Sequence, residues 1–143
     1  MKPASILVID DDAVFQSELK EALSSKGYEV TTVTDPKFAL SAAKKVKPDV
    51  IILDIKLKGA SGLDVFESLK ESEAAANIPV IAVTGVYGKT QDLIKICGIK
   101  ECLIKPFDPE SLIDKIEFML ESKVVEREYR RIEEIEKTLD FEE

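Results

Sequence analysis

The segment ILVIDDDAVF (residues 6–15) joins an apolar run to three consecutive carboxylates, and this junction decides how the fold is interpreted. The run from Ile6 to Ile9 is typical of a buried strand, and Asp10, Asp11 and Asp12 follow it directly. Like charges at the end of a buried strand repel each other and resist removal from water. Either a positive group neutralises these acids, or they lie in solvent.

The rest of the chain alternates short strand-like segments with helical patterns. Gly27 ends the first helical pattern, and Asp35-Pro36 supplies a helix cap followed by a first-turn proline. This alternation predicts an α/β fold in which a parallel sheet carries helices on both faces. The predicted strands span residues 5–10, 28–33, 49–54, 78–84 and 101–106, with helices near 63–72 and 90–97 and a last helix from about Pro109.

Functional side chains follow four of the five predicted strands. The first strand ends at the three aspartates, the third at Asp54, the fourth at Thr84 and the fifth at Lys105. If the strand order is 2-1-3-4-5, these ends meet at one edge of the sheet, where ligands bind in such folds. A single aspartate after a strand is more often a cap or turn residue, but four such positions favour a site.

Carboxylates without histidine favour a hard cation such as Mg²⁺, which prefers oxygen ligands. Asp54, at the end of the middle strand, is placed to act as a nucleophile that forms an acyl phosphate. A hydroxyl and an ammonium from Thr84 and Lys105 would then neutralise and position the phosphoryl group.

The composition of the chain limits which other functions are compatible with the sequence. The 143 residues are enough for one domain with an appendage, and the net charge of −8 argues against a general nucleic-acid binder. The absence of histidine excludes serine–histidine and cysteine–histidine catalysis. No apolar run reaches membrane-spanning length. Cys97 and Cys102 lie in an apolar neighbourhood, so we expect them to be reduced core thiols in the cytoplasm.

Four segments in order carry a resemblance to a known family: ILVIDDD, PDVIILDIKLKGASGLDV, IPVIAVTG and LIKPF. Over roughly residues 4–122 the chain resembles a response-regulator receiver domain of two-component signalling. The resemblance implies a flavodoxin-like, doubly wound sheet of order 2-1-3-4-5, and a signalling switch rather than an enzyme. We expect a receiver domain over residues 1–122 and a helical extension over 123–143.

The resemblance also implies a role for each site residue. Asp54 would be the phosphoacceptor, Asp11 a direct Mg²⁺ ligand, and Asp10 a ligand through water. The backbone carbonyl of Lys56 would complete the metal site. Thr84 and Lys105 would each contact a phosphoryl oxygen, the peptide before Pro106 would be cis, and Asp12 would cap the first helix.

Three positions depart from the family pattern. Cys102 stands where many receivers carry the aromatic residue that turns inward on activation, so this position lacks the side chain of an aromatic switch. Lys58 replaces a usual proline. Val86 cannot orient an attacking water, and we hypothesise that it helps to make the acyl phosphate long-lived, with Lys56 as a modifier.

A second family of proteins is also compatible with the acidic segment after the first strand. Haloacid-dehalogenase-like phosphatases also form an aspartyl phosphate, and Asp10 and Asp12 have the spacing of their nucleophile and second acid. The sequence Ala13-Val14 replaces the glycine-threonine of that family, and no later acidic pair provides its remaining metal ligands. The phosphorylated position separates the two interpretations: Asp54 in a receiver, Asp10 in a phosphatase.

The last part of the sequence predicts a long helix that carries an apolar stripe. Between residues 111 and 143 there is no glycine or proline, and an apolar stripe is spaced by 4, 3, 3 and 4 residues. This pattern is compatible with a linker, or with a homodimer through the C-terminal helix. The stripe consists of Val125, Tyr129, Ile132, Ile135 and Leu139.

Without histidine the chain needs a histidine kinase or phosphotransfer protein as donor, and it would act on a downstream target or an effector domain outside this sequence.

Overall fold

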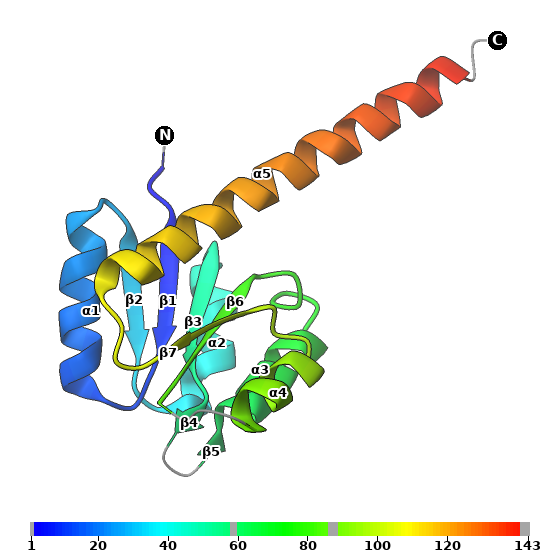
Figure 1. Cartoon of the computed structure of the whole chain (residues 1–143). Helices are drawn as coiled ribbons and strands as arrows, with labels where there is room; N and C mark the ends of the chain where they lie inside the picture. Colours follow the sequence, from blue (N-terminus) through cyan, green and yellow to red (C-terminus); the bar gives the residue numbers. More distant parts are fainter. Residues whose placement is uncertain (1, 58–59, 86–88, 141–143) are drawn as a thin grey trace.

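The computed structural model describes residues 2–57, 60–85 and 89–140. Its central feature is a five-stranded parallel sheet of order β2-β1-β3-β6-β7 (Figure 1). Numbered within this sheet, the order is the predicted 2-1-3-4-5. The strands are β1 (Ser5–Ile9), β2 (Glu29–Val33), β3 (Val50–Asp54), β6 (Val80–Thr84) and β7 (Glu101–Ile104).

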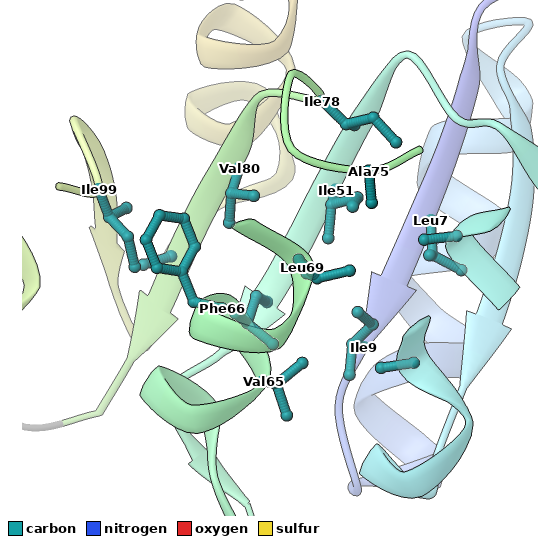
Figure 2. Packing of buried hydrophobic residues seen from close by; sticks show 14 of the residues in the cluster. Leu7, Ile9, Ile51, Val65, Phe66, Leu69, Ala75, Ile78, Val80 and Ile99 are labelled. Carbon is teal, nitrogen blue, oxygen red and sulfur yellow. The ribbon is translucent and has the colours of Figure 1, made fainter. Parts of the chain in front are cut away.

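Helices cover both faces of the sheet, as the alternation of the sequence predicts (Figure 1). One buried cluster lies against α1 and α5, and the other lies against α2, α3 and α4. Figure 2 shows the second cluster, in which residues of α3 pack against β1, β3 and β6. The helices are α1 (Ala13–Ser25), α2 (Ala39–Val46), α3 (Gly62–Glu71), α4 (Lys89–Ile96) and α5 (Pro109–Asp140).

The middle strand is buried along its whole length, which explains its unbroken apolar sequence. All five residues of β3 are buried. Alternate side chains enter opposite clusters: Ile51 and Leu53 face α2 and α3, whereas Val50 and Ile52 face α1 and α5. The strand therefore carries Asp54 to the centre of the sheet edge.

Two local elements differ from the sequence prediction. Residues Pro36–Phe38 form a short 3-10 helix, η1, because the Asp35 side chain accepts a hydrogen bond from the Lys37 backbone N–H. The segment after β3 forms a small antiparallel pair, β4 (Lys56–Leu57) and β5 (Ala60–Ser61). An alternating pattern cannot be recognised in strands of only two residues, so the sequence analysis did not predict this pair. Lys58 and Val86, two of the three departures from the family pattern, lie outside the described residues.

One expectation about the cysteines was wrong. Cys97 is exposed, whereas Cys102 is half-buried and packs against the cluster below α3. Helix α4 ends at Ile96 and Gly98 has a φ of 97°, so the chain turns before Cys97 can follow Ile94 into the core. Both thiols are free.

The last helix continues far beyond the sheet, as predicted (Figure 1). Its 32 residues correspond to about 48 Å at 1.5 Å per residue. Leu112, Ile113 and Ile116 are buried under the sheet, whereas the five stripe residues from Val125 to Leu139 are 52–68% exposed. In the described residues, no helix combines the length and the apolar character that crossing a membrane requires.

Candidate metal and phosphoryl site

The acidic loop follows β1 and begins at the edge of the sheet. Asp10 is only 2% exposed, and its Oδ1 atom accepts a hydrogen bond of 2.9 Å from the Asp12 backbone N–H. The Asp12 side chain accepts hydrogen bonds from the backbone N–H groups of Val14 and Phe15, both at 3.1 Å. These bonds cap α1, which confirms the prediction for Asp12.

Asp54 enters the same pocket from the end of β3. It is 7% exposed, and its Oδ1 atom accepts a hydrogen bond of 3.0 Å from the Lys56 backbone N–H. Carboxylate oxygens of Asp10, Asp11 and Asp54 all lie within 4.8 Å of one another. The sheet topology therefore brings together three acids that are up to 44 positions apart in the sequence.

Lys105 supplies a positive charge next to the buried acids. Its Nζ atom lies 2.8 Å from Asp10 Oδ2 and 3.5 Å from Asp54 Oδ2. The residue follows β7, and the Lys105–Pro106 peptide is cis, as the resemblance implied. An ammonium group from the far edge of the sheet thus neutralises part of the buried negative charge.

The electrostatics of the pocket follow from burial and from these close charges. Burial raises the pKa of the Asp54 carboxyl, and the negative charge of Asp10 raises it further. The hydrogen bond from the Lys56 N–H and the interaction with Lys105 lower this pKa, but the net shift is upward. Burial alone lowers the pKa of the Lys105 ammonium, but the hydrogen bond and charge of Asp10 and the charge of Asp54 raise it overall. Lys105 therefore stays protonated, and the pocket still carries surplus negative charge.

Thr84 is fully buried at the end of β6, between Asp54 and Lys105 along the sheet edge. Its carbonyl accepts a hydrogen bond of 2.8 Å from the Lys105 backbone N–H. All the predicted site residues thus reach one edge of the sheet: Asp10, Asp11, Asp54, Lys56, Thr84 and Lys105.

The donor set fits a magnesium ion. Among the residues that the structure describes, three carboxylates, two of them buried, converge without a nitrogen or sulfur ligand, which is the oxygen chemistry that Mg²⁺ prefers. A bound divalent cation would also offset the charge that Lys105 leaves uncompensated.

Gln16 is a supporting residue that the sequence interpretation missed. It is 3% exposed, and its Nε2 atom donates hydrogen bonds to the carbonyls of Asp10 at 2.6 Å and Val33 at 2.7 Å. It ties the acidic loop to the end of β2. A signal was present, because Gln16 shares the buried face of α1 with Leu19 and Leu23, where a polar residue needs a partner.

Two aromatic rings support Lys105. Its Nζ atom lies 4.0 Å from the centroid of the Phe15 ring, and Phe107 contacts Phe15 edge-on with centroids 5.9 Å apart. A cation over an aromatic face is attracted to it, so Phe15 helps to hold the ammonium in place. Phe15 lies four positions before Leu19, so helical periodicity places both on one side of α1, but it contains no sign of this contact.

Comparisons with known proteins agree with this geometry. The family model described as response regulator receiver domain matches residues 6–117. The response regulator PleD of Caulobacter vibrioides is 32% identical over 131 residues, which cover 91% of this chain and 29% of PleD. The probable transcriptional regulatory protein TcrX of Mycobacterium tuberculosis is 30% identical over 120 residues, covering 83% of this chain and 50% of TcrX. This chain spans half or less of the length of these curated relatives.

Solved structures show the same fold. A CheY-like receiver domain protein from Methanospirillum hungatei has a TM-score of 0.80 at 25% identity, covering 87% of this chain and 98% of that one. The receiver domain of the sensor histidine kinase PA1611 from Pseudomonas aeruginosa has a TM-score of 0.76 at 26% identity, covering 82% and 97%. That structure holds a magnesium ion coordinated in its active-site cleft. The comparisons give no support to the phosphatase alternative with Asp10 as nucleophile.

Proposed function

This chain belongs to the family of response regulator receiver domains, and from that premise we propose that Asp54 accepts a phosphoryl group in a magnesium-dependent reaction. As a receiver domain of the two-component type, the chain acts as a signalling switch. The observation that carries the proposal is the position of Asp54, buried at the centre of the sheet edge among two other acids and an ammonium group.

The proposed step is nucleophilic attack by the Asp54 carboxylate on the phosphorus atom of a phosphohistidine. Oδ1 is held by the Lys56 N–H, so Oδ2 is the oxygen proposed to attack. A P–O bond forms as the P–N bond breaks, and the leaving imidazole takes up a proton. The Thr84 hydroxyl and the Lys105 ammonium then bind phosphoryl oxygens.

We propose that the metal ion is held by Asp10, Asp11, Asp54 and the main-chain carbonyl of Lys56. Asp11 is proposed as a direct ligand and Asp10 as a ligand through water. When bound, Mg²⁺ supplies charge neutralisation and alignment for phosphoryl transfer. The mutual distances of the three carboxylates support this assignment.

Intact mass after incubation with Mg²⁺ and acetyl phosphate tests the acceptor. We expect one phosphoryl adduct on the native chain and none on Asp54→Asn. Asp12→Asn is the matched control, because Asp12 lies in the same acidic stretch but caps α1. An adduct that persists in Asp54→Asn would overturn the assignment. If that persisting adduct were lost when Asp10→Asn is added to Asp54→Asn, the phosphatase chemistry would be favoured.

The donor is proposed to be a histidine kinase or a histidine phosphotransfer protein, because this sequence contains no histidine. The signal would pass to a downstream protein or to an effector domain outside this sequence, without direct nucleic-acid binding. We propose a cytoplasmic location, which the two free cysteines support because reducing compartments keep thiols unpaired.

A second copy of the chain is the proposed partner of the apolar stripe on α5. The stripe is symmetric about Ile132 in its spacing, and all five of its members are exposed. Burying such a stripe against its own copy would remove apolar surface from water. Sedimentation velocity should show a dimer for the native chain and a monomer for Ile132→Glu, with the exposed Lys137→Glu as control. A native chain that stays monomeric would refute the dimer.

A further inference from the structure

A groove of about 520 Å³ lies at the opposite end of the sheet from the acidic pocket. It is bounded by the end of α3, by the segments leading into β6 and β7, and by the part of α5 that leaves the domain. Figure 1 shows α5 departing at the end of the sheet that is remote from β4 and β5. The groove is therefore separate from the phosphoryl site, and its volume falls in the range of ~300–1,000 Å³ that is usual for ligand-binding clefts.

Part of the floor of the groove is made of buried apolar residues. Phe66, Val80 and Ile99 contribute to it, and these side chains lie next to one another at one end of the buried cluster in Figure 2. Phe118 adds an aromatic ring from α5 that is 60% exposed. A large exposed aromatic ring next to other apolar side chains offers a surface that a binding partner can cover.

One wall of the groove is a row of cations on α5. The face of α5 that packs on the sheet carries Leu112 and Ile116, and Met119 follows at the same helical spacing. Beyond the edge of the domain this same face continues as Lys123, Arg127 and Arg130, all three of which line the groove. These residues are four and three positions apart, so they share one side of the helix over about 10 Å.

The groove is a positive region on a negative protein. Five lysine or arginine side chains line it against two glutamates, whereas the whole chain carries a net charge of −8. Glu101, one of the two glutamates, is paired with Lys115 at 2.8 Å. Within the described part of the chain, none of the five groove cations forms an ion pair; they are Lys70, Lys100, Lys123, Arg127 and Arg130.

We propose that this groove binds an acidic, amphipathic peptide segment of a partner protein. Carboxylates spaced along the peptide would meet the cations of α5, and an apolar side chain would cover Phe118 and the floor. A single small anion would reach only one or two of cations that are spread over about 10 Å. A nucleic acid would run from the groove onto the acidic second half of α5, where residues 133–140 hold four acids and one lysine, and its phosphates would be repelled.

Fluorescence anisotropy with the full chain tests the proposal. The probe is a fluorescein-labelled peptide of about 14 residues, long enough to span roughly 20 Å as a helix, with glutamates and leucines on one side. We expect saturable binding that weakens about tenfold in Arg130→Glu. Arg131→Glu is the matched control, because it makes the same charge change one position further along α5, at a residue that does not line the groove. It should bind as the native chain does.

Three further measurements complete the test. The same peptide with every glutamate replaced by glutamine should not bind, and Phe118→Ser should weaken binding without changing the helix content measured by circular dichroism. The proposal would be overturned by a native chain that does not bind the acidic peptide, or by equal losses in Arg130→Glu and Arg131→Glu. Tighter binding of a single-stranded oligonucleotide than of the peptide would also overturn it. None of these readouts depends on phosphorylation of Asp54.

Discussion

Replacing Gln16 by leucine should weaken both the fold and the metal site. The side chain of Gln16 is buried, and it donates its two short hydrogen bonds to the carbonyls of Asp10 and Val33. Leucine has a similar volume but no donor. The change therefore removes hydrogen bonds from a buried position without leaving a cavity.

The magnitude follows from the groups that lose their partner. The Val33 carbonyl keeps a hydrogen bond from the Asp10 backbone N–H at 3.1 Å, so it is not left unpaired. The Asp10 carbonyl loses its 2.6 Å bond. Two lost bonds at about 1 kcal/mol each, with about 1–2 kcal/mol more for one unpaired carbonyl, lower the free energy of unfolding by about 2–4 kcal/mol. For a chain of this size we expect Tm to fall by roughly 8–15 °C.

Thermal unfolding followed by circular dichroism, with and without Mg²⁺, measures both effects. A ligand that binds only the folded state raises its stability by an amount that grows with the logarithm of its affinity. Because Gln16 holds the backbone of Asp10, the Mg²⁺-induced rise in Tm should be smaller in Gln16→Leu than in the native chain. Glu18→Leu, an exposed change to leucine on the same helix, is the control. If Gln16→Leu matched this control in stability and kept the full Mg²⁺ response, the assigned role of Gln16 would be refuted.

Two other changes probe the pocket and the cysteines. A Cβ atom at Gly62 would collide with the carbonyl oxygen of Asp54 and lie within 2.5–2.9 Å of the backbone of Ile55, so Gly62→Ala should lower the free energy of unfolding by roughly 1–3 kcal/mol or more and reduce phosphorylation. Unchanged urea unfolding and adduct yield would contradict this expectation. Exposed Cys97 should react with iodoacetamide at neutral pH well before Cys102, because burial raises the pKa of the Cys102 thiol and reduces its thiolate fraction. Peptide mapping after short exposure measures the order, and raising the pH should speed the reaction of Cys102.

Local sequence patterns were sufficient for the architecture and for the position of the site. The unbroken apolar run of β3 predicts a strand covered on both faces, and alternation with helical patterns predicts a parallel sheet. The carboxyl ends of parallel strands share an edge, and with the order 2-1-3-4-5 that the family resemblance implied, Asp54, Thr84 and Lys105 lie near one another there. Asp12 was also predictable, because a helix cap depends only on residues within one turn.

Contacts between surfaces could not be predicted in this way. Periodicity shows which residues of α1 share a face, but it does not show what lies opposite that face. The bond from Gln16 to Val33 joins positions 17 apart, and the pair Lys105–Asp10 joins positions 95 apart. Such partners depend on how helices and strands pack, which is a property of the whole core.

The sequence by itself thus determined the order of elements, the edge at which the acids meet and the run of α5 beyond the domain, because each depends on local propensity and on strand direction. Only the tertiary structure decided that Gln16 and Phe15 hold the site, that Cys97 faces solvent, and that the cations of α5 line a groove. These features arise where separate elements close against each other, and their distances are set by packing rather than by any interval along the chain.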